Sequence, residues 1–118
     1  MSNDNFQQIF GGRGYSLSSL ESAGVAFDYP TAMEVIEWYK NNKVIILGGD
    51  VLSRNHDELE FTYDSWYYNP TQNAEDCLLS YNKAKQYIEH YHKNNGSNFY
   101  YLIVPKSSRD STTSKENV

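Results

Sequence analysis

The chain has 118 residues and a single cysteine, Cys77, so it is long enough for one domain with its own core but has no internal disulfide. No stretch approaches the roughly 20 apolar residues that span a bilayer, and the first residues lack the pattern of a secretory signal, so we expect a cytoplasmic protein without a membrane partner. The net charge is −5, and residues 1–76 carry 12 acidic and four basic side chains, a balance of −8 that repels nucleic acid and attracts a basic protein surface.

Residues 1–13 are polar and run into a glycine cluster at residues 11–14. A glycine cluster that binds phosphate follows a strand and opens a helix, and the sequence shows neither pattern here. We therefore predict a flexible lead-in over residues 1–13, followed by a single ordered domain over residues 14–104. Residues 16–23 are predicted to form a short helix that ends at Gly24.

A clearer helix is predicted from Asp28, a good N-cap, with Pro30 tolerated in its first turn. Asn41 and Asn42 end the helical pattern. Its apolar face consists of Ala32, Val35, Ile36 and Tyr39.

A hairpin is predicted next. The β-branched run at residues 44–47 is typical of a strand covered on both faces, and the glycines at residues 48–49 indicate a bulge or a close backbone approach. Residues 53–58 are expected to connect this strand to a second one, in which Leu59, Phe61 and Tyr63 alternate with polar side chains. This alternation predicts one wet face, which carries Glu60, Thr62, Asp64, Trp66 and Tyr68.

The longest helix is predicted to be capped by Asn73 and to end at Gly96. Its apolar stripe is Cys77, Tyr81, Ala84, Ile88 and Tyr91. Residues 99–104 predict the last strand, and the apolar-poor residues 105–118 predict a disordered tail. This order of elements predicts an α+β fold, in which a small antiparallel sheet, the hairpin plus the C-terminal strand, packs with helices.

Metal, cofactor and nucleophile chemistry find little support in the sequence. His90 and His92 are two residues apart on a helix and face different ways, so we expect no metal site and no cofactor. Cys77 lies on an apolar stripe, where a thiol is usually an inert hydrophobe. The alternative, a reactive thiol near the helix N-terminus, requires that Cys77 be exposed.

Two aspartates, Asp50 and Asp64, are the remaining catalytic candidates. Pairing of the hairpin strands would bring them close, and two carboxylates can share acid–base work. An aspartate after a glycine pair also accepts backbone hydrogen bonds and fixes a turn. A small hydrolase or isomerase is therefore one alternative, favoured by a deep pocket between the two, whereas a flat acidic face with aromatic side chains favours a binding protein.

Several short motifs together resemble the immunity protein 40 family of bacterial polymorphic-toxin and contact-dependent inhibition systems. The resemblance spans residues 14–104, and Ser65 stands where asparagine is more usual. The residues that carry it are Gly14-Tyr15-Ser16-Leu17, Gly24-Val25, Asp28-Tyr29, Ala32, Ile36, Gly48-Gly49-Asp50-Val51, Tyr63-Asp64-Ser65-Trp66-Tyr67-Tyr68 and Ala84 to Tyr91.

The resemblance implies a non-catalytic protein that binds a cognate toxin, often a nuclease, inside the producing cell. The 11 tyrosines and two tryptophans suit a protein interface, as does the acidic balance, although both also fit an ordinary soluble domain. A regulatory adaptor with another protein partner is the further alternative. The expected toxin-binding residues are Asp50, Glu60, Asp64, Trp66, Tyr67 and Tyr68.

Overall fold

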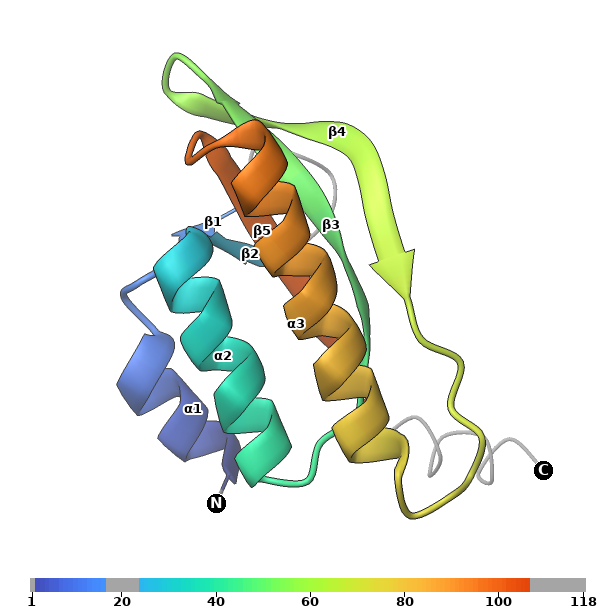
Figure 1. Cartoon of the computed structure of the whole chain (residues 1–118). Coiled ribbons are helices and arrows are strands. Elements are labelled where there is room, and N and C mark those ends of the chain that lie inside the picture. Colours follow the sequence, from blue (N-terminus) through green and yellow to red (C-terminus); the bar gives the residue numbers. More distant parts are fainter. Residues whose placement is uncertain (1, 17–23, 107–118) are drawn as a thin grey trace, which may run out of the picture.

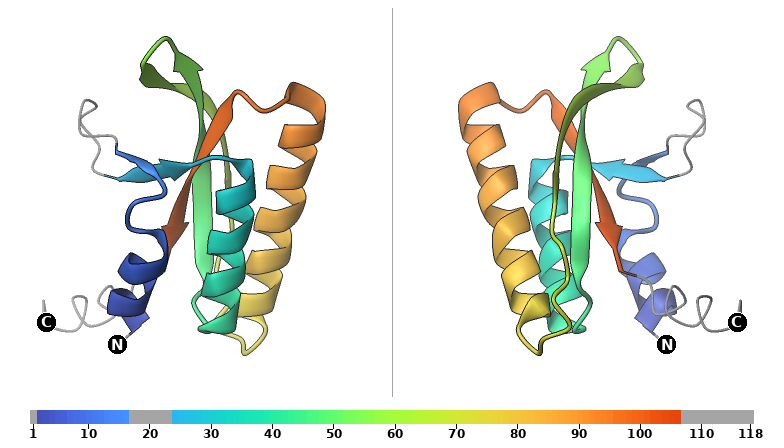
Figure 2. Two further views of the ribbon diagram at one scale, coloured as in Figure 1. Left: turned by 90° about the vertical axis from the view of Figure 1, so that its left-hand side faces the viewer. Right: turned by 90° about the vertical axis from the view of Figure 1, so that its right-hand side faces the viewer.

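Five antiparallel strands form one sheet in the computed structural model, which describes residues 2–16 and 24–106. The strands, in the spatial order β1-β2-β5-β3-β4, are β1 Tyr15–Ser16, β2 Val25–Phe27, β5 Phe99–Pro105, β3 Ile46–Asn55 and β4 Glu58–Tyr67. The helices are α1 Ser2–Phe10, α2 Tyr29–Asn41 and α3 Asp76–Asn95. Helices α2 and α3 lie side by side on one face of the sheet (Figures 1 and 2). The predicted α+β class is confirmed.

Helix α2 follows the sequence prediction closely. The Asp28 carboxylate accepts a hydrogen bond from the Thr31 backbone N–H at 3.1 Å, which satisfies one of the free donors of the first turn. Ala32, Val35 and Ile36 are fully buried, and Asn42 caps the helix. The helical spacing of these apolar residues therefore gives the correct buried face.

Helix α3 also buries the predicted stripe, with two differences. Tyr81, Ala84 and Ile88 are in the core, whereas Cys77 and Tyr91 at the ends of the stripe are half-buried. The helix begins later than predicted, because the Asn73 side chain accepts from the Glu75 backbone N–H in a turn that precedes the helix. Gly96, with φ 91°, ends it as predicted.

The hairpin of β3 and β4 is longer than predicted. Its turn is only His56 and Asp57, since β3 runs to Asn55 and β4 starts at Glu58. The predicted connection over residues 53–58 is therefore wrong at both ends. Gly48 and Gly49 lie inside β3, where the pairing with β5 shifts register before Gly48, so the predicted bulge is confirmed.

The sheet buries apolar side chains on both faces, as the run at residues 44–47 predicted for β3, whereas the alternation in β4 predicted one wet face. Val51 packs in the main core under α2 and α3, whereas its neighbour Leu52 belongs to a second cluster on the opposite face. Leu59 and Phe61 of β4 pack in that second cluster, and Trp66 is buried in the main core. The face of β4 predicted to be wet is thus the face toward the helices.

The first residues form helix α1 where the sequence predicted a flexible lead-in. Phe10 is buried, and its ring lies 6.3 Å from that of Phe27. The Phe6 ring stacks on Tyr39 at 5.4 Å and meets the edge of Trp38 at 5.1 Å. These aromatic contacts provide the burial that a short polar helix otherwise lacks.

Two other predictions fall on positions that are not described. The predicted helix at residues 16–23 lies outside the described residues except for Ser16, which belongs to β1. That strand pairs with β2, and β2 pairs with β5, so the sheet extends beyond the three strands predicted. Residues 107–118 of the predicted tail also lie outside the described part of the chain.

Candidate functional site

Strand β4 forms one edge of the sheet and, among the described residues, pairs only with β3. Residues 55–82 hold six acidic side chains and no lysine or arginine, so this part of the chain concentrates the acidic excess. We call the exposed acidic and tyrosine side chains of the turn and of β4 the hairpin edge: Asp57, Glu58, Glu60, Tyr63, Asp64 and Tyr67. Charges on an edge strand discourage pairing with other strands, and they also give the hairpin edge a negative surface.

The middle of β4 contains a bulge with two extra residues. Leu52 pairs with Phe61 and Asp50 pairs with Ser65, so residues 62–64 all lie opposite Val51. The strand bends along its length, as Figure 1 shows, which is the usual effect of extra residues in one strand.

Side-chain hydrogen bonds hold this bulge in place. The Thr62 hydroxyl donates to the Val51 carbonyl at 2.9 Å and accepts from the Asp64 backbone N–H at 3.1 Å. The Tyr91 hydroxyl, from α3, donates to the Asp64 carboxylate at 2.8 Å. The bulge is therefore tied both to β3 and to α3.

Tyr63, at the centre of the bulge, is the most exposed large hydrophobic residue among those described. Its side chain is 92% exposed and its φ is 70°, in the left-handed region that bulky residues rarely adopt. The alternation of β4 had predicted that Tyr63 faces inward with Leu59 and Phe61, and this prediction is wrong. Tyr67 is also well exposed, at 65%.

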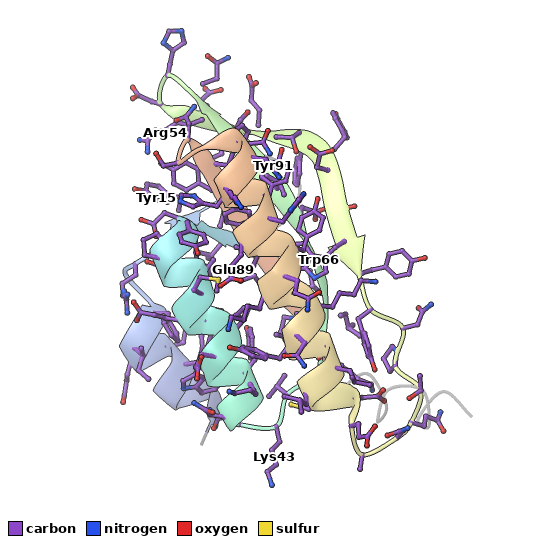
Figure 3. All side chains as sticks on the ribbon, viewed as in Figure 1. Tyr15, Lys43, Arg54, Trp66, Glu89 and Tyr91 are labelled. Atoms are coloured by element: carbon purple, nitrogen blue, oxygen red, sulfur yellow. The ribbon has the colours of Figure 1, made fainter. Side chains whose placement is uncertain are left out.

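Two of the expected toxin-binding residues are not freely available at the surface. Trp66 is 5% exposed and stacks on Tyr87, with ring centroids 4.9 Å apart, between β4 and α3 (Figure 3). Tyr68 follows the end of β4, is half-buried, and donates its hydroxyl to Asp76 at 2.7 Å. The prediction that both lie on a wet strand face is therefore wrong.

Asp50 and Asp64, the catalytic pair considered as an alternative from the sequence, do not lie together. Asp50 pairs with Ser65 and with Leu102 of the second cluster, so it lies on the face opposite the helices. Asp64 turns the other way, toward Tyr91 of α3. The geometry that would favour an acid–base enzyme is absent at these two residues.

Asp76 organises the loop between β4 and α3, a role that the sequence analysis missed. Although only 2% exposed, its carboxylate accepts hydrogen bonds from the Tyr68 hydroxyl and from the Thr71 hydroxyl and backbone N–H, and also from the N–H groups of Gln72 and Asn73. The Tyr68 hydrogen bond, helped by the Thr71 N–H and opposed by desolvation, holds the pKa of Asp76 well below its usual range. The ionised carboxylate therefore stabilises the fold.

This arrangement predicts a pH-dependent effect of Asp76→Asn. A carboxylate with a lowered pKa contributes stability above its unfolded pKa of about 4, and this contribution is lost as the pH falls toward the folded-state pKa. We expect Asp76→Asn to lower the urea midpoint at pH 7 and the difference from the wild type to narrow below pH 4. Glu75→Gln, at an exposed neighbour, is the matched control. Equal midpoints for Asp76→Asn and wild type at pH 7 would contradict this role.

Other candidate sites offer less. The Cys77 sulfur lies 3.5 Å from the Val44 carbonyl oxygen, and burial raises the pKa of its thiol, which favours the inert interpretation. In the described part of the chain, no three His, Cys, Asp or Glu side chains gather as a metal site would require. Nor does any described helix have the length and apolar character needed to cross a membrane.

An open hollow lies between α1 and α2. Its two acidic residues already have basic partners, since Glu34 pairs with Arg13 at 2.9 Å and Glu37 with Lys40 at 3.5 Å. It is lined by Phe10, Met33, Glu34, Glu37, Trp38 and Asn41. The hollow is thus less available to a basic partner than the hairpin edge.

Comparison with known proteins gives one finding. A family model described as Immunity protein 40 matches residues 16–105, which includes β2 to β5, α2 and α3, and of β1 only Ser16. No curated protein and no solved structure shows significant similarity to the chain.

Proposed function

The chain belongs to the immunity protein 40 family, and we propose that it binds and neutralises one cognate toxin in the cytoplasm of the producing cell, through the hairpin edge. The observation that carries this proposal is the combination of exposed tyrosines and acidic side chains on an edge strand. Buried tyrosine anchors supply much of the affinity of protein interfaces, and complementary charge speeds association.

The proposed contact residues differ from those expected from the sequence. Glu60, Asp64 and Tyr67 are exposed and remain in the surface, which now gains Tyr63. Trp66 and Tyr68 instead have structural contacts: Trp66 packs β4 against α3 through Tyr87, and Tyr68 holds the following loop through its hydrogen bond to Asp76. Asp50 lies on the opposite face of the sheet and is not part of this surface.

The proposed toxin has a basic surface. A nuclease fits this requirement, because its active site must attract a phosphate backbone. An acidic inhibitor that covers such a site would exclude the nucleic acid by occupying the same positive potential. The polymorphic-toxin context is part of the same proposal.

Co-expression tests the proposed function. We expect the chain to protect a sensitive strain from the toxin encoded beside its gene and to form a stoichiometric complex with it on size exclusion. A strain that is not protected, together with no complex, would refute the immunity function and favour an adaptor with another partner.

The charge of the hairpin edge should control the rate of association. Glu60→Lys should slow binding by about tenfold or less at low salt, and rising salt should slow the wild type, because exposed rim charges act mainly by steering. Glu89→Lys makes the same charge change on α3 (Figure 3). Stopped-flow measurements that show equal effects of the two variants would place the toxin on another surface.

A further inference from the structure

We infer that the bulge at residues 62–64 holds Tyr63 in a preorganised, exposed conformation as the main anchor of the complex. The Tyr63 side chain inserts into an apolar pocket with a basic rim on the toxin. This inference rests on the proposed function. It assigns a binding role to Tyr63, a residue that the alternation of β4 predicted to face inward.

The backbone of Tyr63 is held in a disfavoured state. A tyrosine with φ 70° is uncommon, because its Cβ crowds the following carbonyl in the left-handed region. Such residues persist where the surroundings fix them, and they gather at binding and active sites. Here the surroundings do fix it, since Tyr63 lies between two residues that are both tied to the fold.

The ties on either side come from different elements. Thr62 bonds to β3 through Val51, and Asp64 bonds to α3 through Tyr91. The Tyr91 ring is itself packed edge-on against Phe99, at 5.3 Å, so the donor is held in place. A register slip of β4 would break both ties at once.

The ring that this framework presents has no packing role in the isolated chain. Tyr63 is 92% exposed, whereas Trp66, three residues later, is buried against Tyr87. A tyrosine offers a large contact area for the loss of only two side-chain torsions. Because the backbone is already fixed, less freedom is lost when it binds.

The neighbouring residues define the pocket it fits. Glu60 and Asp64 are exposed near Tyr63 on the same strand, so lysine or arginine at the rim of the pocket would complement them. The bulge interrupts the regular edge of β4, which disfavours the addition of a continuous strand across residues 62–64. The partner is therefore engaged by insertion of a side chain into its pocket.

The affinity test uses the cognate toxin, separated from the co-expressed complex by denaturation and refolding. We expect calorimetry to show that Tyr63→Ala raises the dissociation constant by about 30-fold or more. Tyr67→Ala should raise it less. Thr62→Val, which removes a positioning residue but leaves the tyrosine, should also weaken binding, and its urea midpoint checks that the fold is kept.

A second measurement tests, without any toxin, whether the backbone at Tyr63 is held at a positive φ in the free protein. Tyr63→Gly and Tyr63→Ala remove the same ring, but only glycine adopts a positive φ without strain. The glycine variant should therefore have the higher urea midpoint, whereas in ordinary strand backbone alanine would be the more stable. A higher urea midpoint for the alanine variant would overturn the inference that the Tyr63 backbone is preorganised.

The outcomes separate the two proposals. If wild-type protein binds the toxin and Tyr63→Ala binds within threefold of it, the anchor is wrong and the proposed function stands. If wild-type protein forms no complex, both are wrong.

Discussion

Replacing Ile88 by alanine should lower the free energy of unfolding by about 2–5 kcal/mol. Ile88 is fully buried in the main core, on the face of α3 that packs against the sheet. Truncation removes apolar contacts and leaves a cavity that the surrounding side chains fill only in part. Urea denaturation followed by circular dichroism measures the loss.

The same truncation at an exposed position of α3 provides the control. Leu78 is 52% exposed, so Leu78→Ala should cost about 1 kcal/mol or less, in proportion to the smaller area it buries. Equal losses for Ile88→Ala and Leu78→Ala would mean that α3 buries a different face.

A single added methyl group at Gly48 or Gly49 should also destabilise the fold, by about 1–3 kcal/mol. At Gly49 a Cβ would overlap the Leu102 carbonyl oxygen and the Trp66 ring. At Gly48, where φ is 152°, it would overlap the backbone of residues 66–67. Backbone atoms cannot move aside as a flexible side chain can, so the strands themselves would have to separate.

Gly12→Ala is the matched control for both glycines. A Cβ at Gly12 meets no atom within 4 Å, so this variant should stay within about 0.5 kcal/mol of the wild type. If Gly49→Ala is as stable as Gly12→Ala in thermal or urea denaturation, the close approach between Gly49 and Trp66 is not a structural requirement.

The helices were predictable because one residue pattern determines each of them. In α2 the N-cap Asp28 and the buried Val35 and Ile36 lie within nine residues of one another, so the pattern that predicts the helix is local in the sequence. The same holds for Tyr81 and Ile88 in α3. The glycines of β3 were also informative, because a close backbone approach is the usual reason for two glycines in a strand.

The orientation of β4 could not be predicted, because alternation tells which residues share a face but not what covers each face. Leu59 and Phe61 look like core residues, yet they pack in the second cluster away from the helices. Trp66, on the other face, enters the main core. A sheet with apolar side chains on both faces removes the contrast on which this inference depends.

The candidate site was predicted in part. The acidic character of the hairpin edge follows from charges counted along the chain. The exposure of Tyr63 does not, because it depends on a bulge fixed by Thr62, Asp64 and Tyr91, and Tyr91 is 27 residues from Asp64. The loop contacts of Asp76 were missed for a different reason, since an aspartate in the first turn of a helix already has an ordinary explanation.

Helix α1 changes where this domain begins. It precedes residue 16, the first residue that the family model matches, yet Phe6 and Phe10 complete the aromatic packing around Phe27 and Trp38. A shortened chain that starts at residue 14 would leave these rings facing water, and exposed apolar patches of this kind promote self-association. We therefore expect the smallest unit that folds cleanly to include α1, which lies outside the residues that the family model matches, and a tag fused at the N-terminus to adjoin a packed helix.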